Sequence, residues 1–157
     1  MNNKIHQIQE IDWTARTFVM RRAVLHFDKL SQFFAGAYKD IYSTLNKSGL
    51  NPTDPPFAIY FSVDPQKGET DLGAAVVIPD SYGALPGFEK ITIPQSKALM
   101  VTYYGPYENM AEVYGQLDKY VEDHHLQKAW VLEEYFSDPM KEPDPAKWKT
   151  NVYYIVR

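Results

Sequence analysis

Cysteine is absent from the 157 residues of this chain, so disulfides, thiol nucleophiles and thiolate metal ligands are excluded. Long apolar runs are absent as well, and the sequence predicts no membrane-spanning segment. The N-terminal stretch, MNNKIHQIQEIDW, lacks the apolar core of a signal peptide. Together these absences predict an ordinary soluble protein, for which a cytoplasmic location is the default expectation.

Basic charge is also scarce, because 20 acidic residues outnumber 16 basic ones and the net charge is −4. Arg21-Arg22 is the only basic doublet, whereas a nucleic-acid surface needs clustered basic residues. There is no G-x-S-x-G, no P-loop and no dinucleotide-binding motif. The segment 122–125, EDHH, offers metal ligands, but consecutive side chains diverge and no second cluster completes a site. We therefore expect no direct nucleic-acid binding, no cofactor and no metal.

Aromatic residues, in contrast, are abundant and make up 15% of the chain, with 12 Tyr, 8 Phe and 3 Trp. This is more amphipathic ring surface than a small core needs, and it indicates an aromatic-lined pocket or an interface. A tyrosine-rich core without any special site fits the composition as well, and that alternative stays open.

Hydrophobic periodicity changes several times along the chain and predicts two halves of similar layout. In the first half we expect a strand over 14–24, a helix from 27 that stops before Gly49, and strands over 57–63 and 71–79. In the second half we expect a strand over 97–105, a helix over 106–124, and strands over 130–136 and 151–157. Residues 80–95 are predicted to connect the halves, and KITIP within them fits either an edge strand or the linker itself.

The predicted fold is therefore α+β, a single domain over 1–157 built from tandem β-α-β-β units with antiparallel sheets. The first unit spans about 8–79 and the second about 96–157, with the linker at 80–95. One helix covers only one face of a three-stranded sheet. The uncovered faces or edges of the two halves are expected to meet or to line a cleft between them. Ligand pockets often form at such junctions.

Two adjacent glutamates interrupt the predicted strand WVLEEYFSDP. Since neighbouring strand residues point to opposite faces, Glu133 and Tyr135 share one face, and Leu132, Glu134 and Phe136 share the other. Leu132 and Phe136 are expected to pack under a helix, which leaves Glu133 on the face that looks into the cleft. Exposure of both glutamates on a half-wet sheet is the alternative, and the pattern by itself favours that alternative.

Several rings are predicted to accompany a carboxylate: Tyr60, Tyr104, Trp148 and Tyr153. Rings around one carboxylate form a site for flat, lipophilic cations, because the rings supply area and cation–π attraction while the carboxylate matches the charge. For any single ring, a place in a tyrosine-rich core is the competing interpretation, and pattern alone favours it.

Four stretches occur in order along the chain: FAIYFSVDP, LMVTYYGPYENMAEVYGQL, LEEYFSDP and DPAKWKTNVYYIV. They resemble the GyrI-like small-molecule-binding family, the effector-binding domain that is also attached to AraC-type and MerR-type regulators. The likeness runs from about Ile8 to Val156. It implies a fold of two βαββ units, that is, two SHS2-like modules.

The resemblance also implies roles for individual residues. The family's central acidic residue lies two positions before the tyrosine of this strand, which is Glu133 here, while Glu134 departs from a commonly apolar position. Tyr60 corresponds to the aromatic residue of the family's second strand, and Trp148 and Tyr153 match the tail motif. With the resemblance added, a functional Glu133 is favoured over an exposed one.

Three functions are compatible with this reasoning. The first, which the sequence favours, is a stand-alone effector-binding domain that takes up amphipathic, aromatic or cationic small molecules, since few residues precede the first strand to form a helix-turn-helix domain. The second is a hydrolase of strained electrophilic toxins, with Glu133 and a tyrosine as acid and base. The third is a protein-interaction module that protects an enzyme or sequesters an inhibitor. Residues 137–150 are expected to form a lid.

Overall fold

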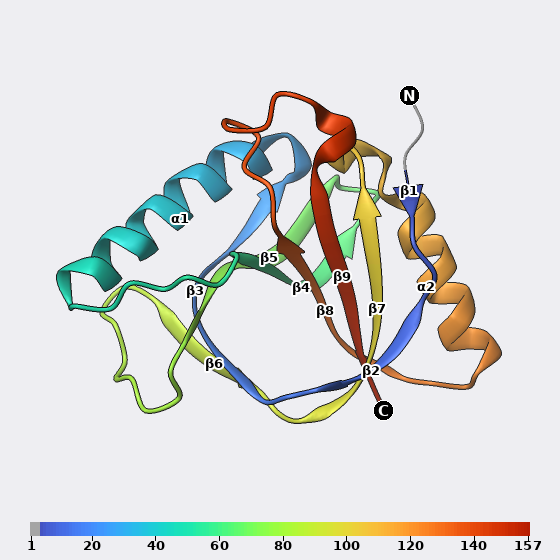
Figure 1. Cartoon of the computed structure of the whole chain (residues 1–157), viewed down its shortest axis with the longest axis horizontal. Helices are drawn as coiled ribbons and strands as arrows, with labels where there is room; N and C mark the ends of the chain where they lie inside the picture. Colours follow the sequence, from blue (N-terminus) through green and yellow to red (C-terminus); the bar gives the residue numbers. More distant parts are fainter. Residues whose placement is uncertain (1–3) are drawn as a thin grey trace. The chain divides into compact units, whose positions relative to one another are not determined.

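The computed structural model describes residues 4–157, which contain nine β-strands and two α-helices (Figure 1). The chain divides into two compact units. One comprises Ala15–Pro94, and the other combines the segment up to Thr14 with Gln95–Arg157. Among the described residues, neither helix is long and apolar enough to cross a membrane.

The unit Ala15–Pro94 is a four-stranded antiparallel sheet with one helix. Its elements are β3 (Arg16–His26), α1 (Leu30–Lys47), β4 (Phe57–Asp64), β5 (Glu69–Ile78) and β6 (Glu89–Ile93). The strand order is β4-β5-β3-β6, and α1 contacts β3 and β5. Helical spacing places Ala37, Ile41 and Leu45 on the buried side of α1, where Ile41 and Leu45 pack with Val19 and Val76.

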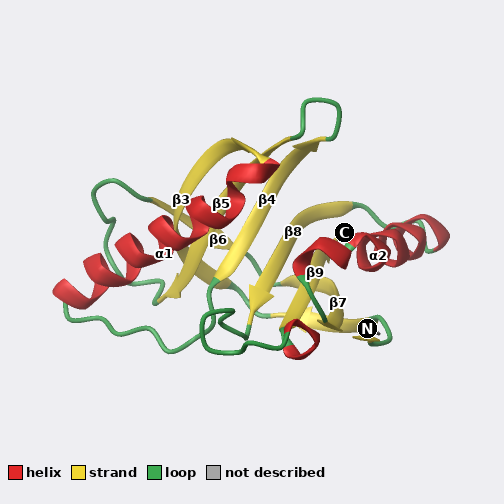
Figure 2. Ribbon diagram, turned by 90° about the horizontal axis from the view of Figure 1, so that it is seen from above, coloured by secondary structure: helices red, strands yellow, loops and turns green. Residues whose placement is uncertain are grey.

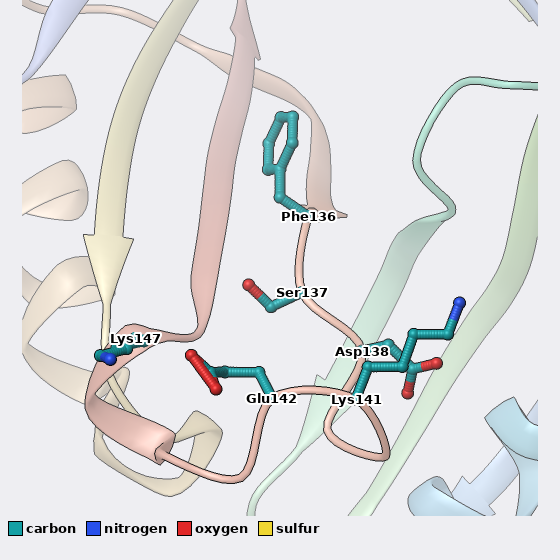
Figure 3. A pocket seen from close by; sticks show the side chains of 6 residues that line it. All are labelled: Phe136, Ser137, Asp138, Lys141, Glu142 and Lys147. Carbon is teal, nitrogen blue, oxygen red and sulfur yellow. The ribbon is translucent and has the colours of Figure 1, made fainter.

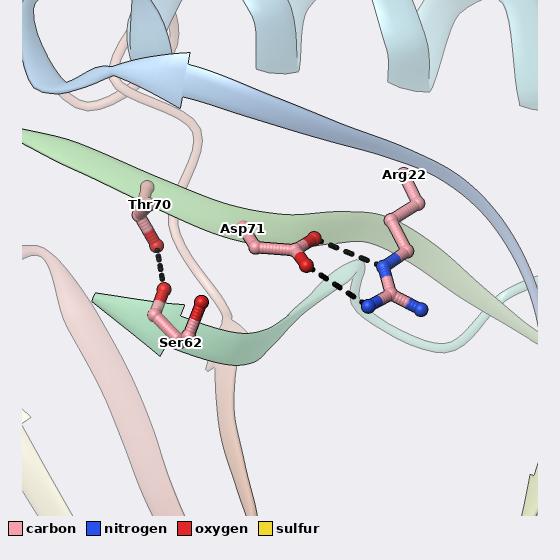
Figure 4. Close-up of polar contacts among 4 residues, drawn as sticks. All are labelled: Arg22, Ser62, Thr70 and Asp71. Atoms are coloured by element: carbon pink, nitrogen blue, oxygen red, sulfur yellow. Dashed lines mark hydrogen bonds and ion pairs between the residues drawn. The ribbon is translucent and has the colours of Figure 1, made fainter. Parts of the chain in front are cut away.

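Polar contacts tie the strands of this unit together at its exposed end. Nε and Nη2 of Arg22 donate to the two carboxylate oxygens of Asp71, each at 2.9 Å (Figure 4). The hydroxyl of Thr70 donates to the backbone carbonyl of Ser62 at 2.8 Å (Figure 4). The hydrogen bond from Arg22 lowers the pKa of Asp71. These contacts lie between neighbouring strands and fix their register.

The other unit also combines an antiparallel sheet with one helix. Its elements are β1 (Lys4–Ile5), β2 (Gln9–Trp13), β7 (Ser96–Tyr104), α2 (Ala111–Asp123), β8 (Lys128–Tyr135) and β9 (Lys149–Val156). Strands β1 and β2 pair with one edge of β7, β9 pairs with its other edge, and β8 pairs with β9. Helix α2 lies against this sheet in both views (Figures 1 and 2). Val113 and Leu117 of the helix pack in one core cluster with Val152 and Tyr154 of β9.

The predicted fold class, α+β with antiparallel strands, is confirmed, while the duplication of one unit stays a prediction. Both predicted helices exist, although each is preceded by a short 3-10 turn, at Phe27–Lys29 and at Tyr107–Asn109. The region 80–95 contains an edge strand, β6, which pairs with β3. Strands β1 and β2 were not expected, although Ile11 and Trp13 alternate with acidic neighbours as a strand requires.

Candidate functional site

Glu133 lies near the end of β8 and is 6% exposed, so its carboxylate is withdrawn from water. Two phenols satisfy it. Tyr114 of α2 donates a short hydrogen bond to Oε2, and Tyr135 of the same strand donates to Oε1 at 2.6 Å. A buried carboxylate is costly unless donors surround it, and here one donor comes from the same strand and the other from helix α2.

Two further aromatic rings contact Tyr135 directly or through one another. The ring of Tyr107 meets that of Tyr135 edge-on with centroids 5.6 Å apart, and it stacks on Trp148 with centroids 5.2 Å apart. Both distances are typical of favourable aromatic pairs. Glu133 is therefore bordered by a connected aromatic group, Tyr107, Tyr114, Tyr135 and Trp148, which we call the Glu133 cluster.

Backbone contacts hold the outer rings of the cluster. The Gly105 amide donates to the carbonyl of Trp148 at 2.9 Å, which ties the turn before Tyr107 to the start of β9. The indole of Trp148 donates to the carbonyl of Glu142 at 2.8 Å. The backbone and the indole of Trp148 are thus both held, and the ring of Tyr107 stacks on this fixed indole.

Tyr107 is electrostatically linked to the acid. Burial raises the pKa of its phenol, and the negative charges of Glu133 and Asp138 raise that pKa further. The phenol is therefore neutral at pH 7 and able to donate a hydrogen bond. Its hydroxyl makes no hydrogen bond to any other residue in the range 4–157, so its donor capacity remains available to a guest.

Glu134 occupies the opposite face of β8 and is 7% exposed. Tyr153 donates to its Oε1 at 2.6 Å, Asn151 donates to the hydroxyl of Tyr153 at 3.3 Å, and Thr102 donates to Asn151 at 2.7 Å. The two neighbouring carboxylates are thus buried separately, each with its own tyrosine partners. This pair explains why adjacent glutamates are tolerated in a strand that buries both faces.

The predicted site residues fall into three places. Trp148 joins Glu133 through Tyr107 and Tyr135. By the pairing of β7 with β9, Tyr104 and Tyr153 belong to the face of Glu134.

Tyr60 belongs to β4, in the unit Ala15–Pro94. Within residues 4–157, no group of three His, Cys, Asp or Glu side chains is arranged to hold a metal ion.

One expectation about strand faces is wrong. Leu132 and Phe136 were expected under a helix, but α2 covers the face of Glu133, where Val131, Val152 and Tyr154 pack with the helix. Phe136 is instead 40% exposed. Alternation fixes which residues share a face, but it does not say which face a helix covers when Val131 and Leu132 are both apolar.

Three rings of the cluster were missing from the predicted site: Tyr107, Tyr114 and Tyr135. A signal for Tyr135 was present, since it lies two residues from Glu133 on the same strand face. Helical spacing puts Tyr114 beside the buried Val113 and Leu117, and no sequence spacing shows that its hydroxyl reaches a strand about twenty residues away in the chain.

A hollow of about 520 Å³ lies along the loop between β8 and β9, the loop that joins Tyr135 to Trp148 in the chain (Figure 3). Its lining is Phe136, Ser137, Asp138, Lys141, Glu142 and Lys147. The loop that lines it also holds Trp148, through the carbonyl of Glu142. The hollow is open to solvent and its lining is mostly charged, whereas small-molecule pockets are mostly apolar.

Comparison with solved structures finds the same fold in several proteins. A chain of the EcmrR-DNA complex is 20% identical with a TM-score of 0.81, and the match covers 96% of this chain but only 57% of that one. The isolated EcmrR C-terminal domain is 18% identical, with a TM-score of 0.78 and coverage of 96% and 97%. This chain therefore spans little more than half of the EcmrR chain.

Two further structures have the same fold. A hydrolase from Listeria innocua, encoded by lin2189, is 14% identical, with a TM-score of 0.67 and coverage of 96% of this chain and 92% of that chain. SAV2435, solved with bound tetraphenylphosphonium, is 15% identical, with a TM-score of 0.64 and coverage of 97% and 94%. No curated protein gives a significant match.

Family membership rests on a direct match over nearly the whole chain. Residues 6–157 match the GyrI-like small molecule binding domain, in agreement with the strand and helix order described above. The predicted resemblance is thereby confirmed, and the chain belongs to the GyrI-like small-molecule-binding domain family.

Proposed function

We propose that the chain binds amphipathic, aromatic or cationic small molecules at the Glu133 cluster. The observation that carries the proposal is a buried carboxylate that accepts hydrogen bonds from Tyr114 and Tyr135 and is bordered by the stacked rings of Tyr107 and Trp148. The rings offer area and a negative π-face, and the acid offers a full charge.

The electrostatics favour a cationic guest over a neutral one. In an environment of intermediate dielectric, opposite charges about 4 Å apart attract by roughly 4 kcal/mol, against about 1 kcal/mol in bulk water. Part of that gain is offset by desolvation of the guest. Because Glu133 is already buried and hydrogen-bonded, the protein bears little further desolvation cost when the guest arrives.

The remaining rings from the sequence prediction belong to the proposal as separate contacts. Tyr104 and Tyr153 lie on the face of Glu134, and Tyr60 lies in the unit Ala15–Pro94. We therefore propose a guest contact for each of them independently of the Glu133 cluster and test each by substitution to Phe and to Ala. Loss of affinity in the alanine variant alone assigns a role to the ring, whereas loss in both variants assigns a role to the hydroxyl.

Titration with tetraphenylphosphonium tests the central proposal, since the related fold of SAV2435 holds this cation. We expect Glu133→Gln to weaken its binding on the order of 10- to 100-fold, and binding of neutral triphenylphosphine oxide by much less. Glu134→Gln is the matched control, because that carboxylate is buried on the other face of β8. Equal losses for both guests, or equal losses in both variants, would rule out charge matching by Glu133.

Hydrolysis is the second candidate, and the phenol of Tyr107, whose pKa is raised by burial and by the nearby charge of Glu133, favours it as a proton donor. Glu133 would take a proton from water, the hydroxide would attack a carbon of a strained electrophilic ring, and Tyr107 would protonate the atom released when the ring bond breaks. Water adds across that bond, so no further reactant is needed. The fold shared with the Listeria innocua hydrolase agrees with this candidate.

Turnover separates the two candidates. A hydrolase releases more than one equivalent of ring-opened product per protein, and Glu133→Gln and Tyr107→Phe should each lower that rate at least tenfold with the guest still bound. A binding domain yields no product at any protein concentration. Product formation that persists in both variants would remove these residues from the mechanism.

A further inference from the structure

Thr150, the second residue of β9, contains a buried polar atom without a partner. The residue is 0% exposed, and its Oγ1 is the single buried side-chain oxygen or nitrogen in residues 4–157 that makes no hydrogen bond. Leaving a buried hydroxyl unpaired costs about 1–3 kcal/mol, and buried hydroxyls in proteins nearly always find a partner. A partner from outside the chain is therefore expected at this position.

Strand pairing places this hydroxyl in the Glu133 cluster. Thr150 is directly opposite Tyr135 on β8 and directly opposite Tyr103 on β7. Residues directly opposite each other in a sheet direct their side chains to the same face. Because the hydroxyl of Tyr135 reaches Glu133, Thr150 belongs to the same face, one diagonal step from Glu133.

The two tyrosines opposite Thr150 already donate their hydroxyl hydrogens to other acceptors. Tyr103 donates to the carbonyl of Pro106 at 2.7 Å, and Tyr135 donates to Glu133 at 2.6 Å. Each phenol has one hydrogen, so neither can also donate to Thr150. The ring of Tyr107 contacts that of Tyr135, so Thr150 adjoins the Glu133 cluster, and a polar group of a guest bound at the cluster would supply the missing partner.

We propose that the hydroxyl of Thr150 is a hydrogen-bonding position of the guest site and selects guests that have an oxygen beside their aromatic cationic body. This inference depends on the proposed function, because it assumes that a guest reaches the Glu133 cluster. Glu133 matches the charge of the guest, and Thr150 fixes its orientation. A guest that lacks the polar group leaves Thr150 unsatisfied and therefore binds more weakly.

A matched pair of probes tests the selection: tetraphenylphosphonium, and the triphenylphosphonium ions that carry one 2-, 3- or 4-hydroxyphenyl ring. Because the four aryl groups of the phosphonium ion are arranged symmetrically, the hydroxyphenyl ring can occupy the place nearest Thr150 without moving the cation. Wild-type protein is expected to bind the best hydroxyl isomer about 2- to 10-fold more tightly than the parent cation. Thr150→Val, which keeps the shape, should abolish that preference, and Thr150→Ser should retain it.

Thermal unfolding separates a binding role from a structural one. Thr150→Val should leave the melting temperature unchanged or higher, because the variant removes an unsatisfied hydroxyl. A preference that survives in Thr150→Val, or that is absent from wild-type protein, overturns the inference. So does a lower melting temperature without any change in preference, which indicates a structural water at Thr150.

The two proposals fail in different ways. If the parent cation binds in a Glu133-dependent manner but no hydroxyl isomer is preferred, only the role of Thr150 is overturned. If wild-type protein binds neither probe, both the role of Thr150 and the proposed function are overturned.

Discussion

At the scale of single residues, the molecule buries two adjacent carboxylates by giving each its own phenols. Glu133 is held by Tyr114 and Tyr135, and Glu134 is held by Tyr153. Neighbouring positions of a strand point to opposite faces, so the charges are separated by the sheet although they adjoin in sequence. This arrangement makes Glu133 and Glu134 natural controls for each other.

The pairing predicts energetic coupling that can be measured. Tyr135→Phe should lower the free energy of unfolding by about 1–3 kcal/mol, because it removes a donor to a buried charge. In denaturant titrations of the single and double variants, Tyr135→Phe and Glu133→Gln should show a coupling of at least about 0.5 kcal/mol.

The matched cycle pairs Tyr153→Phe with Glu133→Gln, whose side chains lie on different faces of the sheet. Those two changes should add within about 0.5 kcal/mol. Additive behaviour in the first cycle would show that the bond between Tyr135 and Glu133 contributes little to stability.

At the scale of elements, helix α2 brings Tyr114 to the carboxylate, so the stability of the helix bears on the site. The helical stripe was predictable, because Met110, Val113 and Leu117 recur at steps of three and four and are all buried. The partner face of β8 was not predictable. Val131 and Leu132 give the strand two apolar faces, and only packing decides which one the helix covers.

Gly115 in the middle of α2 offers a direct test of the helix. A Cβ added there meets no atom within 4 Å, so Gly115→Ala should stabilise the protein by about 0.5–1 kcal/mol through helix propensity. Gly49 is the contrasting control, since its φ of +86° is strained for any other residue and Gly49→Ala should destabilise. Urea unfolding midpoints measure both, and a destabilising Gly115→Ala would contradict this account of α2.

At the scale of the whole molecule, the sequence predicted the α+β class and most elements because long, periodic segments determine them. It named Glu133 as the centre of the binding site, a role that stays a prediction, and it missed the rings that other elements bring to this carboxylate. Strands β1 and β2 were missed because two and five residues are too short for periodicity to stand out. The cleft between the two halves stays a prediction.

Buried tyrosines predict that the protein loses stability at alkaline pH. Burial raises the pKa of Tyr103, Tyr107 and Tyr154, and for Tyr154 the hydrogen bond to Asp118 adds to the effect. A folded pKa above the unfolded value of about 10 leaves stability intact below pH 10 and lowers it as the pH rises beyond. Unfolding free energy should therefore fall between pH 10 and 12.

Absorbance at about 295 nm, which follows phenolate formation, checks this prediction alongside denaturant unfolding. In Tyr154→Phe the decline above pH 10 should be shallower, since one of the raised groups is gone. A decline of the same slope in that variant would assign the alkaline sensitivity to other groups.

The most direct measurement is a crystal structure with tetraphenylarsonium, whose arsenic locates the centre of the cation by anomalous scattering. We expect one arsenic peak beside the Glu133 carboxylate, with the phenyl groups against Tyr107 and Trp148, and no peak in crystals of Glu133→Gln at the same concentration. An arsenic peak remote from Glu133, or equal occupancy in the two proteins, would contradict this expectation.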